Sequence, residues 1–129
     1  MIPIRDRAGV EEARRVARAV TTALGFAPAE AEMAVLATIE LATNLARYAP
    51  GGTVTLAPLA RPRGVGIEVT SRDAGPGIAD LDAALREGFS TGGGRGSGLP
   101  AVRRLMDEFC IASDRGGTRI TARKWRQAP

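Results

Sequence analysis

Residues 88–98, with the sequence GFSTGGGRGSG, restrict the fold more than any other segment of the chain. They include six glycines in eleven positions, and glycine loses more backbone entropy on ordering than any other residue. The segment therefore forms neither a stable helix nor a stable strand. Apolar residues at helical spacing follow it at once, at Leu99, Val102, Leu105 and Met106. We predict a glycine loop that opens directly into a helix.

Two longer helices are predicted near the N-terminus. Apolar residues between Val10 and Leu24 recur every three or four positions, opposite a row of arginines, and Gly25 is a suitable helix end. Pro28 begins a second helix, which runs to about Tyr48, where the sequence APGG stops it.

Alternating apolar and polar residues predict the strands. The predicted strands are a short one at 2–5, a hairpin of 53–59 and 65–69, and a second hairpin of 109–113 and 118–125. Strands and helices are grouped rather than strictly alternating. This order predicts an α+β fold, a two-layer sandwich with a mixed sheet of about five strands and helices on one face. No repeat or linker interrupts it, so residues 1–129 are predicted to form a single domain.

The composition excludes several kinds of site and partner. The chain has no histidine and one cysteine, which excludes a Ser-His triad and a zinc site within one chain. Five aromatic residues, one Trp, one Tyr and three Phe, are few for a base-stacking module, so we expect no nucleic-acid partner. No apolar run approaches the ~20 residues that span a bilayer, and no signal sequence is visible. We expect a cytoplasmic protein without a membrane partner.

The formal net charge is +4, and the basic residues are concentrated at the C-terminal end. Five of them follow the last acid, Asp114: Arg115, Arg119, Arg123, Lys124 and Arg126. Two interpretations stay open. This end is either a solvated strand whose charges discourage edge pairing, or a landing site for an acidic protein or a phosphate.

Two motifs place carboxylates and a carboxamide where they could bind a ligand. In IELATNLARYA, Glu40 and Asn44 are four residues apart and project from one helix face among apolar neighbours. They form either an exposed polar face or a binding pair, because buried polar groups need partners. In SRDAGPG, Asp73 ends a strand just before a turn that contains Gly75 and Gly77. It is either an ordinary turn residue or a fixed acceptor, suited to an exocyclic amine such as that of adenine.

The third motif is GGGRGSGL, in which Gly94, Gly96 and Gly98 recur at every second position before the helix near Leu99. The loop offers backbone N–H groups to an anion, and the helix adds its positive end. The sequence lacks the Gly-Lys-Ser/Thr of a Walker loop and the position of a dinucleotide fingerprint. On its own, the motif is equally well a flexible surface loop.

In this order, and followed by GGT before the last strand, the motifs resemble the GHKL ATPase superfamily, which has the Bergerat ATP-binding fold. Within it, GFSTGGGRGSGLPAVRRLMDEFCIAS and the ending GGTRITARKW resemble the RsbT-like serine/threonine switch kinases of the anti-sigma regulatory branch. The resemblance covers residues 1–126.

The resemblance implies ATP and Mg²⁺ as cofactors and a role for each motif. Asp73 would bond the adenine amine, Asn44 would coordinate Mg²⁺, Thr118 would support the adenine side, and Glu40 would be the general base. The residues that the resemblance assigns to the nucleotide are Asn44, Asp73, Gly75, Gly77, Gly92, Gly93, Gly94, Gly96, Gly98, Leu99 and Thr118. Arg95 and Ser97 depart from the apolar residues usual between the loop glycines. Arg95 either pairs with the γ-phosphate or lies in solvent.

The resemblance implies a protein kinase that phosphorylates a STAS-domain antagonist in a partner-switching stress pathway and activates a PP2C-type phosphatase. An anti-sigma factor that sequesters an RNA polymerase sigma subunit would use the same ATP site, and so would a nucleotide-responsive adaptor. The sequence does not distinguish these functions, and it leaves the oligomeric state open.

Overall fold

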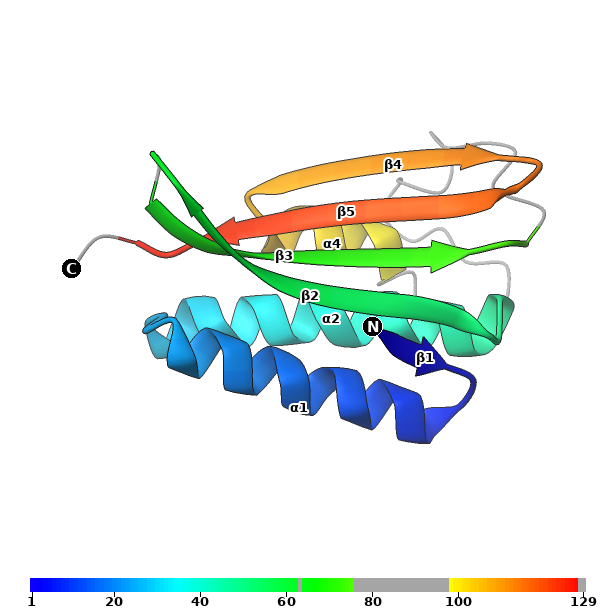
Figure 1. Ribbon diagram of the computed structural model, residues 1–129, viewed down its shortest axis with the longest axis horizontal. Coiled ribbons are helices and arrows are strands. Elements are labelled where there is room, and N and C mark those ends of the chain that lie inside the picture. Colours follow the sequence, from blue (N-terminus) through cyan, green and yellow to red (C-terminus); the bar gives the residue numbers. More distant parts are fainter. Residues whose placement is uncertain (63, 76–97, 128–129) are drawn as a thin grey trace.

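The computed structural model describes residues 1–62, 64–75 and 98–127. Figure 1 shows the order of their helices and strands. In chain order these are β1 (Ile2–Ile4), α1 (Arg7–Ala23), α2 (Pro28–Tyr48), β2 (Gly52–Arg61), β3 (Gly64–Asp73), α4 (Gly98–Leu105), β4 (Glu108–Asp114) and β5 (Gly117–Trp125).

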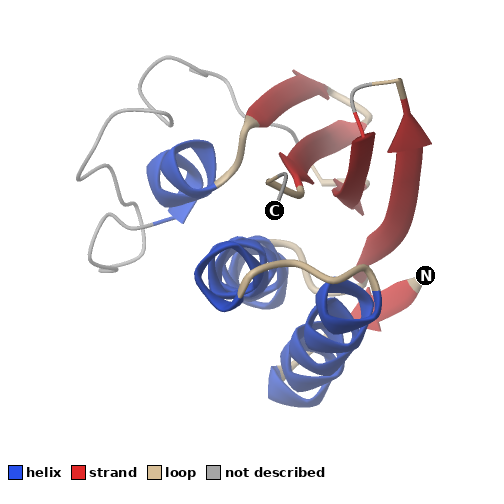
Figure 2. Cartoon of the chain, turned by 90° about the vertical axis from the view of Figure 1, so that its left-hand side faces the viewer, coloured by secondary structure: helices blue, strands red, loops and turns tan. Residues whose placement is uncertain are grey.

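The five strands form one sheet in the order β1-β2-β3-β5-β4, and the helices lie on one face of it (Figure 2). The predicted two-layer α+β sandwich is thus confirmed, but the expected mixture of parallel and antiparallel strands is wrong. Every neighbouring pair is antiparallel. The chain runs from β3 through α4 to β4 at the sheet edge. Strand β5 then returns between the two and is antiparallel to both.

Local sequence signals explain where the two long helices begin. The carboxylate Oδ1 of Asp6 accepts a hydrogen bond from the N–H of Ala8 at 3.0 Å and caps α1. Pro28 occupies the first turn of α2, where its missing N–H leaves no helical hydrogen bond unmade. Over the described ranges, no helix combines the length and the apolar character needed to cross a membrane.

The core lies between the sheet and the helices and is built from small and aliphatic side chains, as the low aromatic content predicts. Its largest fully buried apolar side chains are Ile4, Leu41, Ile67, Val35, Val54, Val69 and Val102. Alanines of α1 and α2, including Ala13, Ala17 and Ala34, are completely buried where the two helices meet. The buried hydroxyl of Thr38 donates to the carbonyl of Ala34 at 2.8 Å, so it carries no unmade hydrogen bond.

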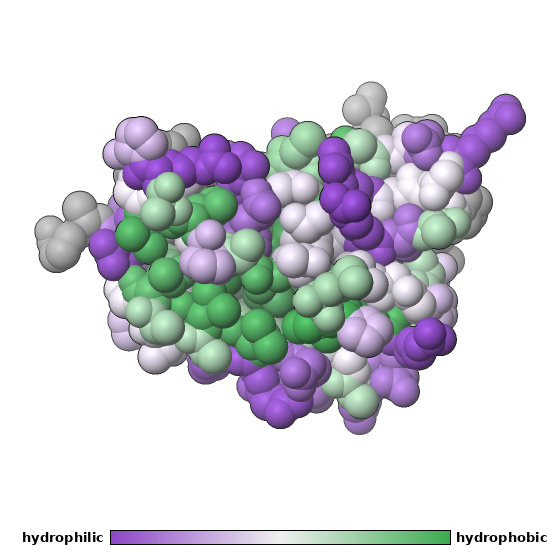
Figure 3. All heavy atoms as spheres, viewed as in Figure 1, coloured by the Kyte–Doolittle hydropathy of each residue, from purple (hydrophilic) through white to green (hydrophobic). Residues whose placement is uncertain are grey.

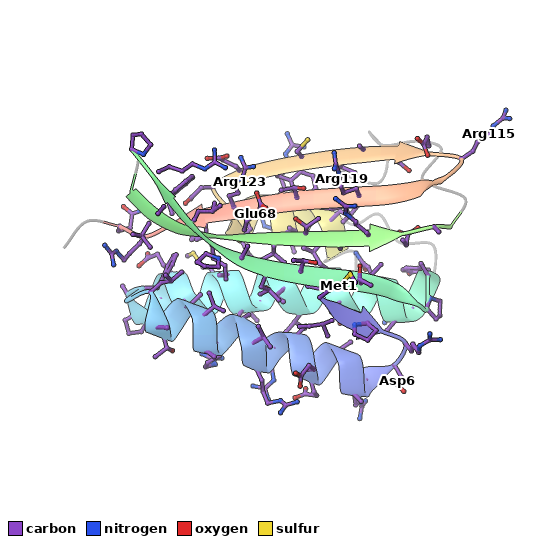
Figure 4. All side chains as sticks on the ribbon, in the orientation of Figure 1. Met1, Asp6, Glu68, Arg115, Arg119 and Arg123 are labelled. Carbon is purple, nitrogen blue, oxygen red and sulfur yellow. The ribbon has the colours of Figure 1, made fainter. Side chains whose placement is uncertain are left out.

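The other face of the sheet is polar over β3, β4 and β5. Figure 3 views the molecule from this side, with hydrophilic residues along the upper part, where β4 and β5 lie, and hydrophobic residues gathered at the lower left. Arg123 of β5 donates to Glu68 of β3 at 2.8 Å and to Glu108 of β4 at 3.2 Å, and Figure 4 shows Arg123 beside Glu68. The hydrogen bond with Glu68, followed by that with Glu108, raises the pKa of Arg123 above its ordinary value.

The predicted basic edge is therefore wrong in two respects. Strand β5 lies inside the sheet between β3 and β4, so its charges do not protect an edge. Acids from earlier in the chain also compensate part of its charge. Besides the pairs of Arg123, Lys124 lies 3.6 Å from Asp107. The sequence shows that basic residues are concentrated at this end, but strand register determines which acids lie beside them.

Candidate functional site

The helix α2 presents Glu40 and Asn44 as predicted, one turn apart and both half-buried. The carboxamide of Asn44 lies against the first residue of α4. A Cβ built on Gly98 would lie 3.4 Å from both the oxygen and the nitrogen of this amide. These distances are ordinary van der Waals contact, so the start of α4 packs directly beside the Asn44 side chain. An amide that can accept or donate is set beside a helix N-terminus.

Strand β3 ends at Asp73, which is half-buried. Alternation along the strand puts Asp73 on the same face as Ser71 and Val69, which are buried against the helices. Its Oδ1 accepts a hydrogen bond from the N–H of Gly75 at 2.8 Å. This bond holds the carboxylate in the turn and leaves its other oxygen as a possible acceptor.

Strand β5 begins against the end of β3. Thr118 pairs with Asp73 in the strand register, and the hydroxyls of Thr118 and Ser113 are 2.8 Å apart. Gly117 precedes Thr118 with φ +135°, and a Cβ there would lie 1.9 Å from the carbonyl oxygen of Asp73. Only a residue without a side chain fits this position, so Gly117 helps to fix where Asp73 lies.

Gly52 allows α2 and the end of β3 to pack closely against the start of β2. A Cβ on Gly52 would lie 2.7 Å from the side chain of Leu45 and 3.3 Å from the Cβ of Asp73. Leu45 follows Asn44 on α2. The end of β3, the C-terminal end of α2 and the start of β5 lie at the right-hand end of the molecule in Figure 1, and α4 lies further inward, behind the sheet.

The structure thus brings Asn44, Asp73, Gly75 and Thr118 to the same end, with Gly98 beside Asn44 and Glu40 one turn further along α2. The side chain of Leu99 is buried at 8% exposure and belongs to the core. Among the predicted residues Gly77, Gly92, Gly93, Gly94 and Gly96 lie outside the described residues, and so does Arg95. A depression of about 340 Å³ at this end is lined by Asp73 and Thr118, and Glu40 and Asn44 are not among its lining residues.

Sequence reasoning missed several contributors to this geometry. Gly52 was interpreted only as part of a helix stop, although the doubled glycine at 51–52 was a visible signal of close packing. Two of the apolar neighbours of Glu40 on α2, Met33 and Leu36, are 38% and 42% exposed. No sequence signal distinguishes this exposed stretch of α2 from its buried face, because both are apolar.

The side chains of the site suit a metal ion that is coordinated mainly by a bound small molecule. Within residues 1–62, 64–75 and 98–127, no cluster of three or more histidine, cysteine or acidic side chains forms a metal site. Asn44 offers one amide oxygen. Mg²⁺ is commonly held by one or two protein oxygens together with phosphates and water. The residues present therefore suit a metal that arrives with a phosphorylated ligand better than a resident metal ion.

Comparison with known proteins gives a family and a relative. Residues 5–124 match the family described as histidine kinase-like ATPase domain. The chain is 42% identical over 114 residues to the serine/threonine-protein kinase RsbT of Bacillus subtilis (strain 168), covering 88% of this chain and 86% of that protein.

Two solved structures share the fold. The mycobacterial sensor histidine kinase MprB gives a TM-score of 0.54 at 21% identity, over 75% of this chain and 74% of that one. The histidine kinase domain of the blue-light activated histidine kinase EL346 of Erythrobacter litoralis gives 0.52 at 21% identity, over 95% of this chain and 60% of that one. At this identity the likeness concerns the fold alone.

Proposed function

Because the chain belongs to the histidine kinase-like ATPase family and is closely related to a serine/threonine-protein kinase, we propose that it is an ATP-dependent protein serine/threonine kinase. The observation that carries this proposal is the contact between the Asn44 amide and Gly98 at the start of α4. It sets an oxygen ligand next to the positive end of a helix, an arrangement suited to phosphate groups and their metal.

In this proposal different residues of the site bind the metal ion, the adenine and the phosphates of the nucleotide. Asn44 would coordinate Mg²⁺, which offsets phosphate charge when bound. The free oxygen of Asp73 would accept the exocyclic amine of adenine, with its orientation fixed by the 2.8 Å bond from Gly75. Thr118 would support the same side, since it pairs with Asp73 across the strands. The predicted glycine loop would contact the phosphates.

Glu40 is the residue that we propose as the general base. It is half-buried and one helical turn from Asn44, so it lies on the face that would bind metal and phosphates. A serine hydroxyl of a partner protein would transfer its proton to the Glu40 carboxylate as its oxygen bonds to the γ-phosphorus of ATP. The bond between that phosphorus and the bridging oxygen would break, and ADP would leave. Such assistance typically contributes about 10²–10⁴-fold to a rate.

The partner that we propose is a STAS-domain protein, with a PP2C-type phosphatase as a second partner after release. The support is the relation to RsbT together with the sequence resemblance to switch kinases. The exposed, unpaired Cys110 is compatible with the reducing cytoplasm that we propose as the location.

The test separates binding from chemistry. Asn44→Ala is expected to weaken calorimetrically measured Mg-ATP binding by at least about tenfold, because phosphate-bound metal loses its protein ligand. Glu40→Gln is expected to keep the affinity within about threefold and to slow phosphotransfer to a STAS protein by about 10²–10⁴-fold. The matched control is Glu32→Gln, which removes an exposed acid of the same helix and should change neither quantity.

Phosphotransfer at the normal rate by Glu40→Gln would disprove the assignment of the base. If the unmodified chain binds nucleotide, phosphorylates no STAS protein and retains a sigma subunit in a pull-down, the chain is an anti-sigma factor instead. Radiolabelled ATP with a panel of STAS-domain proteins, run beside that pull-down, distinguishes these outcomes.

A further inference from the structure

Among the described residues, the outer face of the sheet carries one arginine that is paired with carboxylates and two that are not. Arg123 lies between Glu68 and Glu108 and is fully engaged. Arg72 of β3 and Arg119 of β5 are exposed and directly opposite each other in the strand register. Across the described part of the chain, no carboxylate lies within ion-pair distance of either guanidinium. Because neither has a carboxylate partner in these ranges, Arg72 and Arg119 carry uncompensated positive charge. Like charges placed opposite each other on neighbouring strands are also unfavourable.

A third exposed arginine, Arg115, lies outside the depression. Arg115 lies in the turn between β4 and β5, and Figure 4 shows it projecting beyond the end of the strands, with Arg119 further along β5. We call Arg72 and Arg119, which face each other across β3 and β5, the arginine cluster. Arginine binds carboxylates through two parallel hydrogen bonds, which lysine cannot do.

The arginine cluster borders the depression of about 340 Å³, whose lining includes Arg72, Arg119, Ala112 and Asp114. Two carboxylates also line it, and each is already bonded to the backbone. Asp73 accepts from the N–H of Gly75 at 2.8 Å, and Asp114 accepts from the N–H of Gly116 at 2.7 Å. The depression is therefore basic on the sheet face and acidic at the strand ends.

We propose that this depression and the arginine cluster bind an acidic segment of a partner protein, with carboxylates seated on Arg72 and Arg119. The charge pattern favours a peptide over a nucleic acid. Side-chain carboxylates can be spaced to avoid Asp73 and Asp114. A nucleic-acid strand carries a charged phosphate at every nucleotide and cannot leave out the charges that would lie near Asp73 and Asp114. Glu40 and Asn44 do not line the depression, whereas Asp73 and Thr118, which the proposed function assigns to the adenine side, do. The inference therefore concerns a surface that adjoins the proposed nucleotide site.

The test uses the full chain and a fluorescein-labelled decapeptide of alternating glutamate and serine, with binding followed by fluorescence anisotropy in low salt. Arg72→Glu/Arg119→Glu is expected to weaken binding by about tenfold or more, because two charge-assisted contacts become repulsive. The control is Arg5→Glu/Arg61→Glu, two exposed arginines elsewhere. Both double variants lower the net charge equally, from +4 to 0 by four units, so the control should stay within about twofold of the original chain.

Three results would overturn the inference. The original chain could fail to bind the peptide, or both double variants could lose binding equally, which would indicate only overall charge. Labelled decathymidylate could bind as tightly as the peptide and be lost with Arg72→Glu/Arg119→Glu, which would indicate a nucleic-acid site. Arg72→Gln/Arg119→Gln guards against misfolding, because it removes facing like charges and should fold at least as stably while still weakening binding.

Discussion

Gly117 shows how a single residue without a side chain determines the position of a candidate ligand. Its φ of +135° is unfavourable for other residues, and a Cβ would lie 1.9 Å from the Asp73 carbonyl oxygen. Gly51 has a comparable φ of +101° but nothing within 4 Å of its Cβ position. Substitutions at the two glycines therefore distinguish the cost of backbone strain from the cost of a steric conflict with Asp73.

We predict that Gly117→Ala lowers the free energy of unfolding by about 3 kcal/mol, because strain and overpacking add. Gly51→Ala should cost about 1 kcal/mol from strain alone. Since the conflict at position 117 is with Asp73, only Gly117→Ala should also weaken ATP binding. Urea unfolding and calorimetry measure the two effects. Equal losses of stability in the two variants would show that β5 can move away from Asp73 without penalty.

The helix α4 is held at both ends by other elements. Its first residue lies against Asn44 of α2. At its last residue, the Nζ of Lys124 from β5 donates to the carbonyl of Leu105 at 2.9 Å. A cation at a helix C-terminus stabilises the carbonyls that have no helical partner. The Lys124 side chain is only 8% exposed and also lies 3.6 Å from Asp107. This contact secures a short helix that the candidate site depends on.

Lys124→Met is expected to lower the free energy of unfolding by about 2 kcal/mol, because it removes a largely buried charged hydrogen bond. The control is Arg18→Met, which breaks the Arg18–Glu32 ion pair between α1 and α2 at 2.9 Å, where both side chains are 49% exposed. Exposed pairs contribute about 0–1 kcal/mol, so the control should change little. Urea titration followed by circular dichroism compares them. A larger loss in Arg18→Met would contradict the proposed role of the α4 contact.

At the scale of the whole molecule, one core joins the helices to the sheet. The core cluster includes residues from β1, α1, α2, β2, β3, α4 and β5. Trp125, the sole tryptophan, lies on the opposite face of the sheet, where a Cβ on Gly66 would approach its ring to 2.8 Å. Its indole N–H donates to Glu108 at 2.6 Å. Trp125 fluorescence therefore reports on the sheet independently of the helices.

We predict that the chain unfolds as a single domain. Trp125 fluorescence and far-ultraviolet circular dichroism, which reports mainly on the helices, should give urea midpoints that coincide, as is usual for domains below about 150 residues. A sheet transition clearly separate from the helix transition would contradict a single cooperative unit. Protein concentration should be varied in the same experiment, because a shift of both midpoints would indicate an oligomer.

The sequence by itself determined the local structure and the motif order. Pro28 and Gly25 indicated where α2 begins and α1 ends, but α1 begins at Arg7, before the predicted Val10. The strand predicted at 65–69 extends to Asp73, as the SRDAGPG motif indicated. Such features depend on neighbouring residues, whose propensities and periodicity are visible in the chain. The motif order was also sufficient to indicate the family, which the comparisons then showed.

Only the tertiary structure decided which distant segments meet. The turn at 115–116 predicts that β4 and β5 pair, but not that β5 rather than β4 contacts β3. That choice makes the sheet wholly antiparallel. The same choice of neighbour pairs Arg123 with Glu68 and leaves Arg72 facing Arg119. Strand register depends on long-range packing of whole faces, and a change of one residue would exchange the two faces of a strand. For this reason the polarity of the outer face could not be predicted from local sequence.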